Sequence, residues 1–117
     1  MNYEIIIKEL QNRFHKDQQA LHSDKFNEIS KENTLFLKDL INKIGWPSEE
    51  KVGKQGELAA WLISQHSDFD IGFQEECLAL MKSLSQNPDR NIHIQYLTDR
   101  TLINRGKKQV YGTQGEK

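Results

Sequence analysis

Apolar side chains recur along this chain at intervals of three and four residues, which is the spacing of one face of an α-helix. Five segments carry such an apolar stripe: residues 3–21, 24–44, 54–66, 71–84 and 91–104. No segment alternates between apolar and polar residues over a length that could build the core of a sheet. The pattern therefore predicts an all-α fold, with residues 1–117 forming a single compact bundle of about five helices.

Residues that end or begin helices lie between these stripes. The Gly-Trp-Pro sequence at residues 45–47 ends the second segment, because a proline cannot supply the amide that a continuing helix needs. Residues 48–53 are expected to form the connection that follows. Asp70 is predicted to cap the start of the fourth helix, and the composition of residues 85–89 is typical of a turn.

The segment after Gly106 has a different character. Residues 107–114, which we call the strap, are too few and too polar for another core helix, so we expect them to lie extended over the helices. Gln109, Tyr111 and Thr113 alternate along the strap and would share one side of it. We expect the strap to pack Tyr111 against the helices and to close a pocket.

Each predicted helix also carries a polar residue on its apolar face. The fifth helix is expected to face inward through Ile92, Tyr96 and Ile103, and Asp99 falls between the last two. The other intruders are Asp17, Asn33, Gln65 with His66 beside it, and Gln74, while Arg100 flanks the fifth helix face. An unpaired buried polar group costs about 1–3 kcal/mol, against about 5–15 kcal/mol for the whole stability of a small domain. These groups must therefore pair with one another, as a structural network, or line a polar pocket.

Composition restricts the class of protein. With 117 residues, 36% of them apolar and 28% charged, the chain is an ordinary globular domain. Its single cysteine, Cys77, falls on an apolar stripe and is expected in the core, which favours a reducing compartment and a cytoplasmic location. The longest apolar run near the start has three residues, so no membrane association is expected.

The charge is uneven along the chain. Residues 90–117 hold six basic and two acidic residues, a balance of +4, whereas residues 1–89 hold ten basic and fifteen acidic residues, a balance of −5. A basic end of this kind fits either a solvated surface or an anionic partner. Nucleic acid is the less favoured partner, because few aromatic residues, Tyr96 and Tyr111, are interleaved with these charges.

Signals for metals and cofactors are weak. His66, Asp68 and Asp70 offer one imidazole and two carboxylates, but no second histidine is well placed and the two aspartates stand where a helix start wants caps. Glycine patterns for phosphates or dinucleotides are absent. We therefore expect no metal and no cofactor.

Short motifs from residue 33 to residue 114 together resemble a bacterial domain family of unknown function. They are Gly-Trp-Pro at 45–47, Gln-His-Ser-Asp at 65–68, Phe-Gln at 73–74, Asp-Arg at 99–100, and Gln109 followed by Tyr-Gly-Thr-Gln at 111–114. The resemblance implies a mainly helical domain and no particular reaction. It marks these positions as functional: Gln65, His66, Asp68, Gln74, Asp99, Arg100, Gln109, Tyr111 and Gln114.

Two hypotheses about function follow. In the first, a pocket between helices binds or transforms a small polar or anionic molecule. His66 and Asp99 are then catalytic, in hydrolysis or group transfer, because a free histidine titrates near neutral pH and a carboxylate fixes its tautomer. His66, Asp99 and Gln74 should form one cluster, with ligand-binding groups in Gln65, Asp68, Gln74, Arg100, Gln109, Tyr111 and Gln114. In the second, the protein is a non-enzymatic interaction or regulatory module that holds a protein partner through the Trp46 region and the strap, and its inward polar residues are architecture.

Overall fold

A computed structural model of the chain describes residues 3–115 and contains five α-helices, with no strand in that range. They are α1 (Glu4–Ala20), α2 (Phe26–Ile44), α3 (Glu49–Gln65), α4 (Ile71–Lys82) and α5 (Pro88–Asn104). The prediction of an all-α fold of five helices is confirmed. None of these helices is long and apolar enough to cross a bilayer. The chain divides into two compact units, and the boundary falls between His66 and Ser67.

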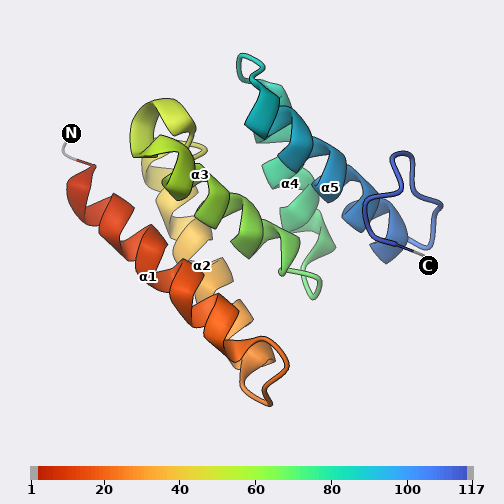
Figure 1. The fold of residues 1–117 in the computed structure, drawn as a ribbon, viewed down its shortest axis with the longest axis horizontal. Coiled ribbons are helices and arrows are strands. Elements are labelled where there is room, and N and C mark those ends of the chain that lie inside the picture. Colours follow the sequence, from red (N-terminus) through yellow and green to blue (C-terminus); the bar gives the residue numbers. More distant parts are fainter. Residues whose placement is uncertain (1–2, 116–117) are drawn as a thin grey trace. The chain divides into compact units, whose positions relative to one another are not determined.

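Unit 1 consists of α1, α2 and α3. Figure 1 shows α1 and α2 as a hairpin of helices, and both helices contact α3. The three apolar stripes meet in a core whose members are each less than a tenth exposed: Leu10, Leu37, Leu40, Trp46, Val52, Ala59, Ala60 and Ile63. Helical spacing brings the members on α1, α2 and α3 to one interior, and the turn between α2 and α3 adds Trp46.

The third helix begins earlier than its stripe predicts. Residues 49–52 form a helical turn, and Gly53 interrupts the helix with φ 79° and ψ 170° before the main part of α3 continues. The predicted connection at residues 48–53 thus contains a helical turn, and the predicted start at residue 54 is where regular helix resumes. A positive φ of this kind is readily available only to glycine, which explains the residue type.

A buried carboxylate fixes the turn before α3. Glu57 is only 4% exposed, and its two oxygens accept from the Trp46 indole nitrogen at 2.9 Å and from the Glu49 backbone nitrogen at 2.8 Å. The Gly-Trp-Pro turn is therefore tied to α3 by one side chain. It also leaves Trp46 only 3% exposed.

Unit 2 consists of α4, α5 and the strap. The side chain of Asp70 accepts from the Phe73 backbone nitrogen at 3.1 Å, so the predicted N-cap of α4 is confirmed. The prediction for the start of α5 was wrong by three residues. Asn87 caps that helix by accepting from the Arg90 backbone nitrogen at 2.8 Å, and Pro88 takes the first helical position, where its missing N–H is harmless.

The inward face of α5 also differs from the prediction. The buried apolar residues of this helix are Ile94 and Leu97, whereas Ile92 is 50% and Tyr96 is 38% exposed. Ile94, Leu97 and Thr101 also lie at helical spacing, so periodicity alone did not choose between the two faces.

Cys77 is fully buried in the core, as predicted.

Two glycines provide a matched pair of substitutions. Gly53→Ala should destabilise the protein by about 1–3 kcal/mol, because alanine is strained at this positive φ even though no atom lies within 4 Å of the added Cβ. Gly72→Ala, inside α4, should stabilise it by about 0.5–1 kcal/mol, since the nearest atom is 3.9 Å away and the φ is not positive. Urea unfolding of the two variants checks this, and equal effects of the same sign would contradict it.

Candidate functional site

Most of the residues that the sequence singled out lie in three places: a polar cluster at His66, a second one at Asp68, and the contacts of Asp99 with the strap. In unit 1, His66 follows the last residue of α3, and its backbone nitrogen donates to the Leu62 carbonyl. Its Nδ1 lies 2.7 Å from Oδ2 of Asp17 on α1. Asp17 is 1% exposed, and its other oxygen accepts from Gln18 Nε2 at 3.0 Å. We call Asp17 and His66 the dyad.

The dyad determines how the imidazole is presented. An ionised carboxylate can only accept, so Nδ1 donates to it, and in the neutral imidazole Nε2 then keeps the lone pair. Phe26 packs edge-on against the imidazole, with ring centroids 5.1 Å apart and an interplanar angle of 72°. The ring is therefore held from two sides. Within residues 3–115 no hydrogen bond is made at Nε2, and the side chain is 15% exposed.

Asn33, another inward polar residue, is part of a structural contact between α1 and α2. Its Oδ1 accepts from Arg13 Nη1 at 3.1 Å, and its Nδ2 donates to the Arg13 carbonyl at 3.4 Å. The Arg13 guanidinium also lies 4.3 Å above the centroid of the Phe36 ring and forms an ion pair with Glu9 at 2.9 Å. The side-chain oxygen and nitrogen of Asn33 are therefore both hydrogen-bonded, and we assign this residue a structural role.

In unit 2 the carboxylate of Asp68 accepts hydrogen bonds from three residues. Its Oδ1 accepts from Arg100 Nε at 2.8 Å, from Asn104 Nδ2 at 2.8 Å and from Gln74 Nε2 at 3.2 Å, and its Oδ2 accepts from Arg100 Nη2 at 2.5 Å. Asn104 Nδ2 also donates to Gln74 Oε1 at 2.9 Å. We call these four residues the Asp68 cluster. It brings together three predicted site residues: Asp68, Gln74 and Arg100.

The surroundings of Asp68 keep it charged. Burial by itself would raise the pKa of Asp68, but the hydrogen bonds from Arg100 and Asn104, the charge of Arg100 and the hydrogen bond from Gln74 outweigh burial and hold the pKa below its ordinary value of 3.8. Asp68 and Arg100 therefore form a bidentate ion pair at neutral pH.

A small pocket of about 120 Å³ lies beside this ion pair. Its lining consists of Asp68, Arg100, Ile103, Asn104 and Gln114. The sequence marked three of these five residues as ligand-binding. Asn104 was missed, although it lies four residues after Arg100 and so shares its face of α5, a spacing that could have indicated it.

Asp99 anchors the strap. This side chain is fully buried, with Oδ1 accepting from the backbone nitrogens of Val110 at 2.8 Å and Tyr111 at 3.0 Å. Its Oδ2 accepts from the backbone nitrogen and from the hydroxyl of Thr113, both at 2.8 Å. Burial would raise the pKa of Asp99, but these hydrogen bonds outweigh it and hold the pKa below its ordinary value of 3.8.

The predicted pairing of His66 with Asp99 joins residues of two different units and stays a prediction. The carboxylate at His66 is Asp17, and both oxygens of Asp99 are used by strap donors. Gln74 likewise belongs to the Asp68 cluster. The sequence placed Asp17 on an inward face, but nothing in a sequence pattern joins two residues that are 49 positions apart. That all these residues serve one functional site stays a prediction.

The remaining predicted positions lie at the end of α3 and in the strap. Gln65 is the last residue of α3 and is 6% exposed. Gln109 closes the strap on itself, since its amide donates to the Gly115 carbonyl at 2.6 Å and accepts from the Gln114 backbone at 2.8 Å. Gln114 Oε1 accepts from Arg100 Nη1 at 3.2 Å. Tyr111 is 52% exposed, and the strap is held by backbone N–H groups that donate to Asp99.

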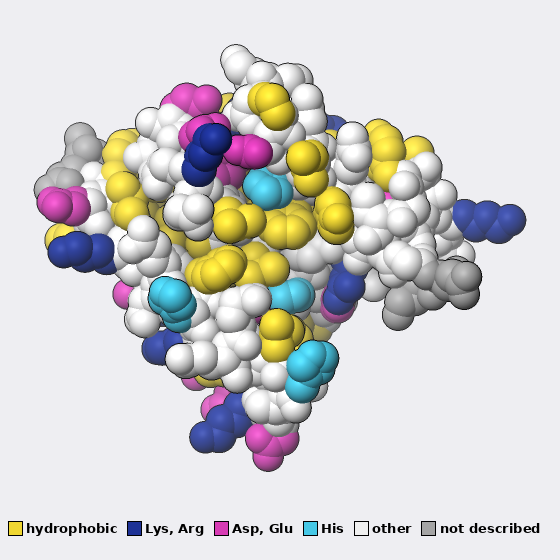
Figure 2. All heavy atoms as spheres, in the orientation of Figure 1, with side chains coloured by type: hydrophobic (Ala, Val, Ile, Leu, Met, Phe, Trp, Pro, Cys, Tyr) yellow, Lys and Arg dark blue, Asp and Glu magenta, His cyan; other side chains and the backbone are white. Residues whose placement is uncertain are grey.

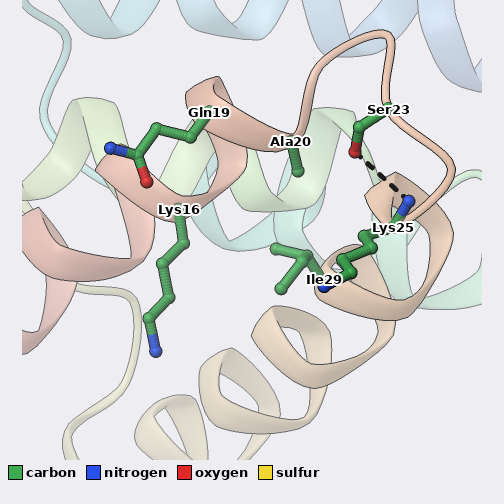
Figure 3. A pocket seen from close by; sticks show the side chains of 6 residues that line it. All are labelled: Lys16, Gln19, Ala20, Ser23, Lys25 and Ile29. Atoms are coloured by element: carbon green, nitrogen blue, oxygen red, sulfur yellow. Dashed lines mark hydrogen bonds between the residues drawn. The ribbon is translucent and has the colours of Figure 1, made fainter.

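A larger pocket of about 390 Å³ lies in unit 1, where α1 turns into α2. Figure 3 shows Ala20 and Ile29 pointing toward one another from the two helices, with Ser23 accepting from the Lys25 backbone nitrogen at 3.2 Å. Lys16 and Gln19 complete the lining. None of the predicted site residues lines this pocket.

Basic side chains do not gather on the face drawn in Figure 2. They stand apart from one another there, and several lie beside an Asp or Glu side chain. In unit 2, Arg105 forms a bidentate pair with Glu75, at 3.1 Å and 2.6 Å. Part of the basic excess near the end of the chain is therefore neutralised locally.

These features define an all-α protein whose polar clusters are organised around the carboxylates of Asp17, Asp68 and Asp99. The chain belongs to the family of unknown function DUF6624, whose model matches residues 6–116. The coarser part of the resemblance, a family of unknown function, is thus confirmed. No match to the chain was found among curated proteins or among solved structures.

Replacing the anchor should release the strap. Asp99→Asn replaces one carboxylate oxygen, an acceptor, by an amide NH₂ group, a donor that would face other N–H groups. The free energy of unfolding should fall by about 1–3 kcal/mol. The amides of Val110, Tyr111 and Thr113 should then lose protection against hydrogen exchange, while helix amides keep theirs. Asp39→Asn, in an exposed pair with Lys43, is the matched control and should change neither quantity.

The strap should also respond to acid. The pKa of Asp99 is lower in the folded protein than its unfolded value of about 3.9. The stabilisation is therefore fully present above about pH 4 and is lost as the pH falls through the lowered folded pKa. Protection factors of the same three amides should stay constant from about pH 7 to pH 5 and fall only below about pH 4. A loss that begins near neutral pH would contradict this.

Proposed function

We propose that this protein performs acid–base chemistry on a small polar molecule, with Nε2 of His66 as the atom that accepts and returns the proton. One observation carries the proposal. Nδ1 of His66 is fixed at 2.7 Å from the buried carboxylate of Asp17, while Nε2 makes no hydrogen bond within the described residues. This arrangement orients an imidazole and leaves one nitrogen for a reacting group.

The dyad suits hydrolysis or group transfer. Nε2 would accept the proton of an attacking water or hydroxyl group, and the imidazolium that forms would be stabilised by the negative charge of Asp17. The same nitrogen would then give its proton to the leaving group. Asp17 takes the place that the sequence gave to Asp99, which acts as the anchor of the strap. The single, buried Cys77 fits a reducing compartment, and we place the protein in the cytoplasm.

The alternative, an interaction module without turnover, also has an observation in its favour. Asp17, Asp68 and Asp99 each accept hydrogen bonds from neighbouring groups, as in a structural network. Its partner would meet the exposed Val110 and Tyr111 of the strap, because Trp46 is buried against Glu57 and offers no surface.

Substitution at His66 separates the two functions. The probes are p-nitrophenyl acetate and p-nitroacetanilide, an ester and an amide that report cleavage by colour. The wild-type protein should release the chromophore from at least one of them. His66→Gln should lower that rate by about 10²–10⁴-fold while circular dichroism stays unchanged. Asp17→Asn should also lower it, because the amide no longer fixes the tautomer.

His15→Gln is the matched control, since His15 is exposed and lies edge-on to the Phe14 ring. This variant should keep the wild-type rate. The proposal falls if wild type and His66→Gln cleave both probes equally. If His66→Gln lowers the melting temperature and leaves the rates unchanged, the dyad is architecture and the alternative holds.

A further inference from the structure

We infer that the pocket beside Arg100 in unit 2 is a binding site for a small neutral carboxamide or ureido group. The pocket is lined by Asp68, Arg100, Ile103, Asn104 and Gln114. The inference concerns unit 2 alone and does not depend on chemistry at His66. It rests on the charge, the hydrogen-bonding capacity and the size of the pocket.

The charge of the lining favours a neutral ligand. The carboxylate of Asp68 and the guanidinium of Arg100 form a bidentate pair at 2.8 Å and 2.5 Å, so their charges cancel. An anion would gain the attraction of Arg100 only against the repulsion of Asp68, and a cation would meet the reverse. The part of the pocket lining formed by Asp68 and Arg100 therefore favours neither a positive nor a negative ligand. A neutral polar group avoids the conflict.

The remaining hydrogen-bonding capacity is mixed. A guanidinium has five N–H groups, and three of those of Arg100 are used, by the two oxygens of Asp68 and by Gln114 Oε1. Two N–H groups are therefore left within the described residues. Asn104 Oδ1 makes no hydrogen bond there, and Asp68 Oδ2 accepts only one. The pocket thus offers both donors and acceptors from adjacent side chains.

A carboxamide or urea matches this set, because its carbonyl oxygen accepts and its N–H groups donate within one small planar group. A carboxylate only accepts, and an ammonium only donates. Ile103 adds an apolar side to the pocket, against which a methyl or methylene group could pack. The composition of the lining therefore favours an amide-bearing molecule.

The volume limits the size of the group. A cavity of about 150 Å³ accommodates benzene, which has six heavy atoms. The pocket here holds about 120 Å³, so a group of about four or five heavy atoms fits, with the rest of a ligand outside. Acetamide and urea, with four heavy atoms each, are probes of this size.

Titration of the full chain with acetamide, urea and acetate, followed by ¹H–¹⁵N spectra, tests the inference. Acetate has the shape of acetamide but carries a negative charge and has no donor. Acetamide and urea should produce saturable shifts of the Arg100 Nε–H and Asn104 side-chain signals, with a dissociation constant in the millimolar range expected for so small a probe. Acetate should produce none at the same concentrations.

Three variants check the location. Arg100→Gln removes the guanidinium and should weaken acetamide binding by about tenfold or more. Ile103→Phe fills the pocket, removes no hydrogen-bonding group, and should weaken binding as well, so the test survives if Arg100→Gln does not fold. Arg105→Gln is the matched control, because Arg105, the C-cap residue of α5, forms the same kind of bidentate pair but does not line the pocket. It should bind acetamide like wild type.

The inference is overturned if acetate binds as tightly as acetamide, if neither acetamide nor urea gives saturable shifts up to about 100 mM, far above a millimolar dissociation constant, or if Arg105→Gln weakens binding as much as Arg100→Gln. His66→Gln separates this result from the proposed function. Acetamide should bind that variant as it binds wild type. Binding without cleavage of the chromogenic probes would leave the pocket standing and remove the function proposed for His66.

Discussion

The position of the strap depends on the carboxylate of Asp99. An ionised carboxylate in a protein interior is costly unless donors saturate its oxygens, and α5 itself cannot supply them, because its backbone N–H groups are used within the helix. The strap supplies four donors, three of them backbone N–H groups. This arrangement places Gln114 against Arg100, where it becomes one wall of the pocket. One buried charge thus organises the end of unit 2.

The sequence predicted the helices well and the partners of its polar residues poorly, for a physical reason. Apolar periodicity reports burial of a helix face, which is a local property, so the five helices and the N-cap at Asp70 were found. Two apolar faces compete on α5, and only packing decided that Leu97 and Ile94 are the buried ones. Hydrogen-bond partners are not local. Asp99 binds backbone donors, which carry no sequence signal, and Asp17 meets its partner across 49 positions.

Local pairing also changes the meaning of the uneven charge. The basic end of the chain fitted either a solvated surface or an anionic partner, but Arg100 is paired with Asp68 and Arg105 with Glu75. Arg90 is 1% exposed and donates to the Ser85 carbonyl before α5. Half of the six basic residues in that part of the chain are therefore engaged inside unit 2, which reduces the long-range attraction for anions. A count of charges along a sequence cannot distinguish such pairs from a free basic surface.

A structural polar side chain differs from a candidate functional one in how much of its hydrogen-bonding capacity is used inside the protein. Both oxygens of Asp99 and of Glu57 are used by internal donors, and each of these side chains holds a turn or a strap in place. The dyad differs, since the carboxylate of Asp17 pairs with one nitrogen of His66, and the other nitrogen makes no hydrogen bond within residues 3–115. A buried polar group that is fully paired has nothing left to offer a ligand. Polar groups whose hydrogen-bonding capacity the fold uses only in part are therefore the better candidates for a functional site.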